Sequence, residues 1–452
     1  MAEFTLHFPK GFQWGCATAP YQTEGNTTNS DWWAWEQSEG HVAGAQKSGR
    51  ACDWWGDGFL ADLDWMQRLN NNAHRCGVEW SRIEPKEGTF DDAALERYRF
   101  MLKSLRERGI APMVTLHHFS NPIWVAERGG WETTDILPLF DRFVTKVVES
   151  LKDLCDTWIT VNEPTVYAAL GYLQKPGDTS RHQTTWPPGK FDADLAIAVG
   201  DNMLLGHAGA YQTIHRIQPD ARVGIAHSMQ FLAPTNPRSL LDRLVLRWQD
   251  RFANQGILDA VLLGRIPRPA IGVRRVSALR DSVDFIGLNY YARELVAFDR
   301  TSPGMLFGRR MQNPQGEISD RNYGEVYPRG LYYLLKRIGR YRKPIYITEN
   351  GIPDHDDDRR PTFLINHLKQ VWHAINENVP VKGYYHWTLT DNFEWAEGWN
   401  LRFGLVEFDP ATQRRTLRQS GELYGDICRN NFLDTDMVRR YAPALMETVF
   451  RG

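Results

Sequence analysis

Two glutamates stand at places in the sequence where a carboxylate is unexpected. Glu163 closes the apolar, β-branched run of "WITVNEPTVY" (158–167), and Glu349 closes a similar run in "YITENG" (346–351). Two carboxylates that meet can cleave a glycosidic bond, because one protonates the leaving oxygen while the other attacks the sugar or activates water. Each tripeptide alone, N-E-P or E-N-G, is also an ordinary turn signal. The chemistry therefore depends on whether the fold brings the two together.

Eight short runs that are nearly continuous in apolar or β-branched residues are the elements that would position this pair. Such runs are typical of parallel strands that are covered on both faces. Glu163 and Glu349 close the fourth and the seventh run. The eight runs are residues 12–19, 73–80, 111–119, 157–164, 221–229, 283–291, 344–351 and 381–389.

Segments with helical periodicity separate these runs. Residues 136–154 carry an apolar stripe that includes Phe140, Val144 and Leu151, and residues 92–109 end in a glycine stop. The alternation predicts an α/β fold, a (β/α)₈ barrel, as a single domain over the whole chain, residues 1–452. A doubly wound open sheet is the competing fold, but it usually has fewer strands, and no G-x-G-x-x-G follows any run.

Two connections are too long for simple turns, residues 20–52 and 292–327. Long loops on a barrel are usually functional, and the active site lies at the carboxyl ends of the strands. We therefore expect both loops to border the site. The acidic run "DHDDDRR" (354–360) also follows a strand, and a solvated turn explains it.

Tryptophan is frequent in or near the predicted strand-end loops. A sugar has apolar C–H faces and polar edges, so its site needs flat rings beside amide, carboxylate and imidazole groups, although aromatic rings also fill cores. Residues 386–399, "HWTLTDNFEWAEGW", supply that mixture. The eleven tryptophans are Trp14, Trp32, Trp33, Trp35, Trp54, Trp55, Trp124, Trp131, Trp387, Trp395 and Trp399.

Charge and composition argue against polyanionic and membrane partners. Lys and Arg total 53 and Asp and Glu total 55, no basic run is present, and no window is apolar enough to span a membrane. The N-terminus lacks the features of a signal peptide, so we expect a cytoplasmic protein without nucleic-acid or membrane partners. The five cysteines form no C-x-x-C pair, and no ligand set accompanies the adjacent histidines; we expect no metal and no cofactor.

Seven motifs in order resemble glycoside hydrolase family 1, the retaining β-glucosidase and β-galactosidase family. They are "GFQWGCATAPYQTEG", "HRCGVEWSRIEP", "TLHHF", "TVNEP", "GLNYY", "ITENG" and "WTLTDNFEW". The resemblance implies an exo-acting retaining β-glycosidase for small-molecule β-glycosides or oligosaccharides. It favours β-glucosidase activity and leaves β-galactosidase and β-fucosidase activity open.

The resemblance also implies the catalytic residues. Glu163 matches the general acid and base, and Glu349 matches the nucleophile. Arg75 and Tyr291 match the residues beside the nucleophile, and Asn289 matches a neighbour in the same network. In such a pair Glu349 should be ionised, while burial and the like charge of Glu349 should raise the pKa of Glu163. Retention requires carboxyl groups that are about 5 to 5.5 Å apart.

A second set of residues matches the groups that bind the sugar. His117 and His118 are equal candidates from the strand pattern alone, and the motif selects His118. Glu394 would repel a phosphate, which favours a sugar without one. The groups that would hold the hydroxyls are Gln22, His118, Asn162, Glu394 and Trp395, with Trp387 as the stacking platform.

The sequence departs from the family pattern at the rim of the site. Phe119 stands where a tryptophan is frequent, and Thr165 stands where many members carry a larger aromatic residue. Both leave the leaving-group preference open. Transglycosylation through the same covalent intermediate is the main alternative to hydrolysis. A non-catalytic sugar-binding protein would have lost one of the two carboxylates, and this chain keeps both.

Overall fold

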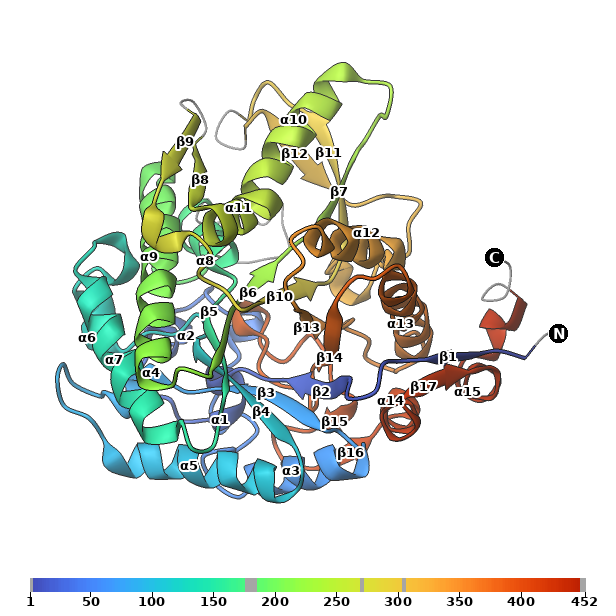
Figure 1. Cartoon of the computed structure of the whole chain (residues 1–452), viewed down its shortest axis with the longest axis horizontal. Coiled ribbons are helices and arrows are strands. Elements are labelled where there is room, and N and C mark those ends of the chain that lie inside the picture. Colours follow the sequence, from blue (N-terminus) through green and yellow to red (C-terminus); the bar gives the residue numbers. More distant parts are fainter. Residues whose placement is uncertain (1–2, 175–184, 269–271, 303–305, 448–452) are drawn as a thin grey trace.

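The computed structural model describes residues 3–174, 185–268, 272–302 and 306–447. Within them, eight parallel strands close into a barrel in the order in which they occur along the chain (Figure 1). Each strand lies inside one of the eight predicted runs, so the predicted (β/α)₈ barrel is confirmed. The strands are β2 (Gln13–Ala17), β3 (Ala73–Gly77), β4 (Ala111–His117), β5 (Thr157–Asn162), β6 (Arg222–Ser228), β10 (Phe285–Tyr290), β13 (Ile345–Asn350) and β14 (Val381–Trp387).

Helices cover the outside of the barrel; seven of them connect consecutive strands, and α14 follows the last strand. They are α3 (Gly58–Arg68), α5 (Asp92–Glu107), α7 (Ile136–Leu151), α9 (Ala193–Ile217), α11 (Gly256–Leu263), α12 (Pro328–Gly339), α13 (Arg360–Asn376) and α14 (Gln419–Asn430). The predicted stripe of α7 is buried at Phe140, Val144 and Leu151. Helix α5 is capped by Asp91, whose carboxylate accepts the amides of residues 93 and 94, and it ends just before Gly109, where φ is +73°.

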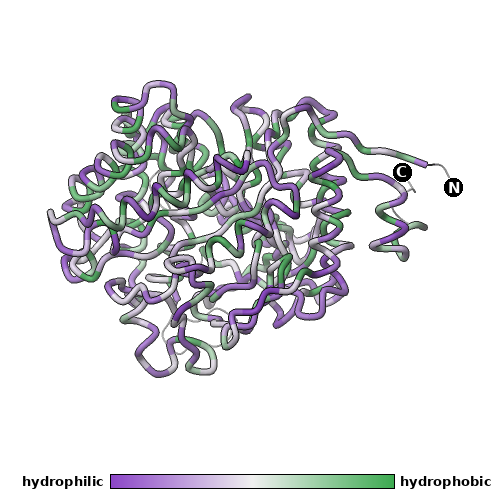
Figure 2. Tube along the Cα trace, turned by 90° about the horizontal axis from the view of Figure 1, so that it is seen from below, coloured by the Kyte–Doolittle hydropathy of each residue, from purple (hydrophilic) through white to green (hydrophobic). Residues whose placement is uncertain are grey.

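Burial on both faces explains the apolar runs. Every residue of β3, β5, β10 and β13 is buried, because side chains on one face fill the barrel and those on the other meet the helices. Hydrophilic residues dominate the peripheral loops (Figure 2). The assignment of residues 1–452 to a single domain stays a prediction, since it includes residues outside the described part of the chain.

The two long connections are more ordered than loops. Residues 20–52 contain two short helices, α1 (Pro20–Glu24) and α2 (Asp31–Glu36). Residues 292–327 are not an irregular loop: strands β11 (Arg293–Phe298) and β12 (Gly308–Met311) join β7 (Phe231–Pro234) in a three-stranded sheet, and helix α10 (Leu240–Asp250) contacts all three strands. Residues 303–305 of this predicted loop lie outside the described residues.

The acidic run at residues 354–360 is solvated only in part, at His355, Asp356 and Asp358. Asp354 and Arg360 are fully buried and Asp357 is nearly so. The Arg360 guanidinium bonds the Asp357 carboxylate and the carbonyl of Arg402, while Asp357 accepts the amide of Ser420 at 2.8 Å. These buried charges are paired, as burial demands, and they join the start of α13 to α14.

The tryptophans divide between the hydrophobic core and the predicted site. Trp14 lies in β2 rather than near a strand-end loop, and its indole nitrogen donates to Asn431 at 2.9 Å. Its ring packs against Phe8 and Phe12 in the hydrophobic core. Trp131 is fully buried against Phe140. These two indoles therefore have core positions, whereas Trp387 and Trp395 lie at the predicted site.

Short elements complete the described chain. In the described residues no helix is both long and apolar enough to cross a membrane. The remaining helices are α4 (Trp80–Ile83), α6 (Ile123–Glu127), α8 (Pro164–Tyr172) and α15 (Thr435–Tyr441), and the remaining strands pair as β1 (Thr5–His7) with β17 (Phe432–Asp434), β8 (Arg265–Arg268) with β9 (Gly272–Arg275), and β15 (Val406–Phe408) with β16 (Arg415–Leu417).

Candidate active site

The backbone at Glu163 turns sharply at the carboxyl end of β5. Glu163 has a φ of 46°, in the left-handed region, which costs a residue other than glycine about 1 kcal/mol. Its amide donates to the carbonyl of Ala226 on β6 at 2.8 Å, and Pro164 begins α8 with its fixed φ. This strained turn directs the carboxyl group of a nearly fully buried residue, and such strain is typical of functional positions.

Glu349, at the end of β13, lies between a cation and a phenol. The Arg75 guanidinium approaches Oε1 at 2.5 Å, and the Tyr291 hydroxyl donates to Oε2 at 2.7 Å. Arg75 is itself fully buried and also bonds Thr115. Both carboxylate oxygens of Glu349 are therefore held by groups that favour the ionised form.

Two asparagines connect the carboxylates. The Asn289 amide donates to Glu163 Oε1 at 2.8 Å, and Asn289 lies opposite Glu349 across β10 and β13, where it lowers the pKa of that carboxyl group. Asn162 accepts from Arg75 at 2.7 Å and from Asn289 at 3.2 Å through the same oxygen. The two carboxyl groups therefore gather around a single amide, that of Asn289, on the strand between β6 and β13.

The surroundings give the two glutamates different proton affinities. Burial and then the charge of Glu349 raise the pKa of Glu163 to about 8, against the opposing effect of bonds from Asn289 and Ser228. Burial also raises the pKa of Glu349, but Arg75 and Tyr291 oppose that rise. Glu163 is therefore the group that holds a proton at neutral pH.

The two adjacent histidines take separate surroundings. His118 Nε2 lies 3.1 Å from the side-chain nitrogen of Asn162. The Asn162 side-chain oxygen already accepts two hydrogen bonds, so its NH₂ group faces His118 and donates to Nε2. Its Nδ1 is buried without a partner in the described residues. His117 instead contacts Asn121 and Trp131 on the other side of the strand. The structure thus places His118, and not His117, in the network of the carboxylates.

Gln22 and Glu394 form the second part of the site. Gln22 Nε2 donates to Glu394 Oε2 at 3.0 Å, to Asn392 Oδ1 at 3.1 Å and to the carbonyl of Phe393 at 3.0 Å. The Gln22 Oε1 atom is buried and makes no hydrogen bond within the described chain. Burial raises the pKa of Glu394 to about 8, opposed by bonds from Gln22 and Trp387.

Aromatic rings join the two parts. The His118 ring lies 6.1 Å from the Trp387 ring and 6.0 Å from the Trp395 ring, nearly parallel to both. All eleven predicted site residues thus gather at the carboxyl ends of the barrel strands.

Two polar residues of the site were absent from the sequence prediction. Ser228 ends β6 and bonds Glu163, and Asn392 bonds Gln22. Asn392 lies inside the quoted "WTLTDNFEW" motif, and Ser228 is the last residue but one of the fifth predicted run. The same strand-end reasoning that selected Glu163 could have found Ser228.

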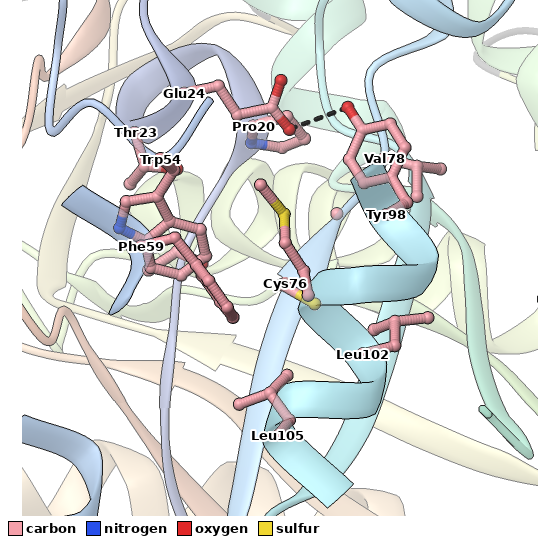
Figure 3. A pocket seen from close by; sticks show the side chains of 13 residues that line it. Pro20, Thr23, Glu24, Trp54, Phe59, Cys76, Val78, Tyr98, Leu102 and Leu105 are labelled. Atoms are coloured by element: carbon pink, nitrogen blue, oxygen red, sulfur yellow. Dashed lines mark hydrogen bonds between the residues drawn. The ribbon is translucent and has the colours of Figure 1, made fainter. Parts of the chain in front are cut away.

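A small internal cavity lies between α1 and α5 (Figure 3). Its volume of about 10 Å³ leaves room for about one water molecule. Cys76 and Leu105 line it, and the Tyr98 hydroxyl donates to the Glu24 carboxylate at 2.8 Å at its edge. None of the described residues that line it is a predicted site residue, so it is distinct from the carboxylate network.

Comparison with known proteins agrees with this geometry. The model of glycosyl hydrolase family 1 matches residues 4–432. The chain belongs to glycosyl hydrolase family 1. It is therefore a glycoside hydrolase, and the enzymes of this family act with retention.

Three similar proteins show how this chain compares with known members of the family. Beta-glucosidase A of Thermotoga maritima is 32% identical and covers 94% of this chain and 99% of its own. A beta-galactosidase of Sulfolobus acidocaldarius is 30% identical, and the match covers 96% of this chain and 97% of that protein. The structure of a beta-glycosidase from Pyrococcus horikoshii superposes with a TM-score of 0.88 at 36% identity, covering 97% of this chain and 98% of that one.

Proposed function

We propose that this enzyme is an exo-acting β-glucosidase that hydrolyses non-phosphorylated β-glycosides with Glu349 as nucleophile and Glu163 as acid and base. One observation carries the proposal. Two buried glutamates lie beside Asn289, which bonds Glu163 and stands opposite Glu349 in the sheet, yet only Glu349 bonds a cation, Arg75, and only Glu163 has its pKa raised to about 8. A retaining pair needs this combination of closeness and unequal proton affinity.

In the first step the ionised Glu349 carboxylate attacks the anomeric carbon, and the proton of Glu163 passes to the leaving oxygen. The Tyr291 and Arg75 bonds hold the nucleophile and keep its charge. The aglycone leaves as a neutral alcohol, and the sugar stays bound to Glu349 through an ester of α configuration.

In the second step Glu163 acts as the base. Once Glu349 is esterified, the like charge that raises the pKa of Glu163 is gone, so this pKa falls and the carboxylate can take a proton from water. The water then attacks from the β face and releases the sugar with its original configuration. The same carboxylate thus changes role because its neighbour loses a charge.

The binding set supports a glucoside as the main substrate and leaves room for a galactoside. The free oxygen of Gln22 can accept a sugar hydroxyl, and Glu394 can meet the hydroxyls at positions 4 and 6. His118, Asn162 and Trp395 would hold further hydroxyls, with Trp387 beneath the ring. The beta-glucosidase and beta-galactosidase names of the two relatives support both activities. A phosphate at position 6 would meet the carboxyl group of Glu394, which offers it no positive charge.

A panel of aryl β-glycosides tests the proposal. We expect the highest kcat/KM for the glucoside, lower values for the galactoside and fucoside, and no turnover of a 6-phosphoglucoside. Each assay is repeated with a sugar acceptor, because glycosylated acceptor in excess of free glucose would identify a transglycosylase instead. A galactoside preferred by tenfold or more (about 1.4 kcal/mol) would contradict the glucosidase assignment. The cytoplasmic location expected from the sequence stays a prediction.

A further inference from the structure

Helix α10 exposes an apolar face that nothing in the described chain covers. Leu240 is 76% exposed, Leu241 51%, Leu244 42% and Trp248 43%. Residues 240, 244 and 248 recur every four positions, so they form one stripe along the helix. We call these four residues the α10 apolar face. The opposite side of the helix is buried, where Val245 packs with Leu232 and Val296.

The sheet beside α10 extends this surface. Phe298 and Phe307 are each 40% exposed. Phe298 is two residues from Val296 in β11 and so points to the same side of the sheet, toward α10. Its amide donates to Asp242 of α10 at 3.0 Å, and the carbonyl of Gly308, next to Phe307, accepts from Gln249 of the same helix at 2.9 Å. Exposed apolar clusters of this kind mark interaction sites.

A row of arginines borders the α10 apolar face. Arg243, Arg247 and Arg251 are exposed and also recur every four positions, and no ion pair joins any of them to another residue of the described ranges. The two acids of the helix are engaged elsewhere: Asp242 accepts backbone amides, and Asp250 pairs with Arg337 at 2.8 Å. We call these three residues the arginine row. With Asp242 and Asp250 engaged elsewhere, the exposed charges along this side of the helix are those of the arginine row, although the whole chain has a formal charge of −2.

A second copy of the chain fits this surface poorly. In a two-fold symmetric contact through α10, antiparallel helices set Arg247 near its own copy and Arg243 near Arg251, and parallel helices set each of the three arginines near its own copy. Like charges without acidic partners oppose that contact. An anionic partner with an apolar interior satisfies both features, because it can receive leucine and tryptophan side chains while it neutralises the arginines.

We propose that α10 binds the surface of a bilayer that contains anionic phospholipids. Leucine and tryptophan on one side and arginine along its border are the composition of helices that lie in the membrane interface. The helix lies at the periphery of the molecule (Figure 1). Strands β7 and β11 of the same unit follow the carboxyl ends of β6 and β10, so this unit lies on the same end of the barrel as the catalytic glutamates. Attachment through α10 would hold that end near the bilayer.

Vesicle co-sedimentation of the full-length enzyme tests the proposal. The probes are vesicles of phosphatidylcholine alone and of phosphatidylcholine mixed equally with phosphatidylglycerol. We expect binding to the mixed vesicles that weakens as salt is added. The triple substitution Leu240→Ser, Leu244→Ser and Trp248→Ser should lower the partition coefficient about tenfold or more, and Arg243→Gln with Arg247→Gln and Arg251→Gln should remove the preference for anionic lipid.

Phe191→Ser is the control for an exposed apolar residue outside α10, because Phe191 is 64% exposed and lies just before α9. Unchanged hydrolysis of a soluble aryl glucoside by every variant shows that the barrel is intact. Equal binding by the control and the triple serine variant, or no binding of the wild type to mixed vesicles, would overturn the proposal. So would sedimentation velocity showing a dimer that the triple serine substitution dissociates, because α10 would then be covered by a second copy.

Discussion

Glu163 and Glu349 are residues of the same type, are both buried and both lie beside Asn289, yet their surroundings differ. Glu349 is held by Arg75 and Tyr291, and both favour its charge. Glu163 is bonded by neutral groups only, Asn289 and Ser228, and it faces the negative charge of Glu349. The roles of the two carboxylates are therefore set by which of them pairs with the Arg75 cation.

Removal of the nucleophile should have the largest effect on activity. Glu349→Gly should lower kcat by a factor on the order of 10⁴ or more, because no other group can form the covalent intermediate. Added azide should restore turnover of an activated aryl β-glucoside and yield the α-glucosyl azide, since azide enters from the vacant face. A β-glucosyl azide, or near-normal activity without azide, would reverse the assignment.

Removal of the proton donor should have a smaller and selective effect. Glu163→Ala should lower kcat/KM roughly 10² to 10⁴-fold for glycosides with poor leaving groups, which need protonation. Activated aryl glycosides should form the intermediate almost normally and then accumulate it as an initial burst. With azide this variant should yield the β-glucosyl azide, the opposite product to that of Glu349→Gly. Equal losses for both leaving groups would argue against Glu163 as the acid.

Loss of the hydrogen bond from Tyr291 to Glu349 should have a smaller effect on kcat. Tyr291→Phe removes a hydrogen bond to a charged group, worth about 1.5 to 3 kcal/mol, so kcat should fall roughly 10 to 100-fold. The pKa of Glu349 should rise, which moves the acidic limb of the pH profile to higher pH. Tyr323→Phe is the matched control, because its ring contacts that of Tyr291 at 5.9 Å. An equal effect of both substitutions would indicate ring packing rather than the hydroxyl.

The pH profile is expected to show the smallest effect. Glu163 must be protonated in the first step, so kcat/KM should fall as pH rises through about 8. Glu349 must be ionised, so kcat/KM should also fall as pH drops through its pKa, which burial raises. The Asn289 amide lowers both values, and Asn289→Ala should therefore move both limbs to higher pH. Movement of only one limb would show that the amide serves one carboxylate.

The barrel could be predicted from the sequence because strands that are buried on both faces appear as apolar runs. All eight strands lie within apolar runs, and Glu163 and Glu349 interrupt two of them at the mouth. Partnerships between distant residues leave no such pattern. The run at 354–360 looks solvated, yet Asp357 and Arg360 are buried because Ser420 and the carbonyl of Arg402 lie beside them.

Helix α10 illustrates a second kind of omission. Arg243, Arg247 and Arg251 are separated by three residues each, so the sequence contains no basic run and its net charge is close to zero. They line up only once the segment is wound into a helix. Exposure of Leu240 likewise depends on which side of α10 meets the sheet. The expectation of no membrane partner rests on the net charge and apolar content of the whole chain, whereas the proposed attachment rests on the surface of one helix.

The central claim is that Glu349, and not Glu163, forms the covalent bond to the sugar. Incubation with an activated 2-deoxy-2-fluoro-β-glucoside, followed by proteolysis and mass spectrometry, tests it most directly. The fluorine slows release of the intermediate, so the modified residue can be identified. We predict one fluoroglucosyl group on Glu349. A label on Glu163 or another residue, or rapid inactivation without any covalent label, would contradict the account.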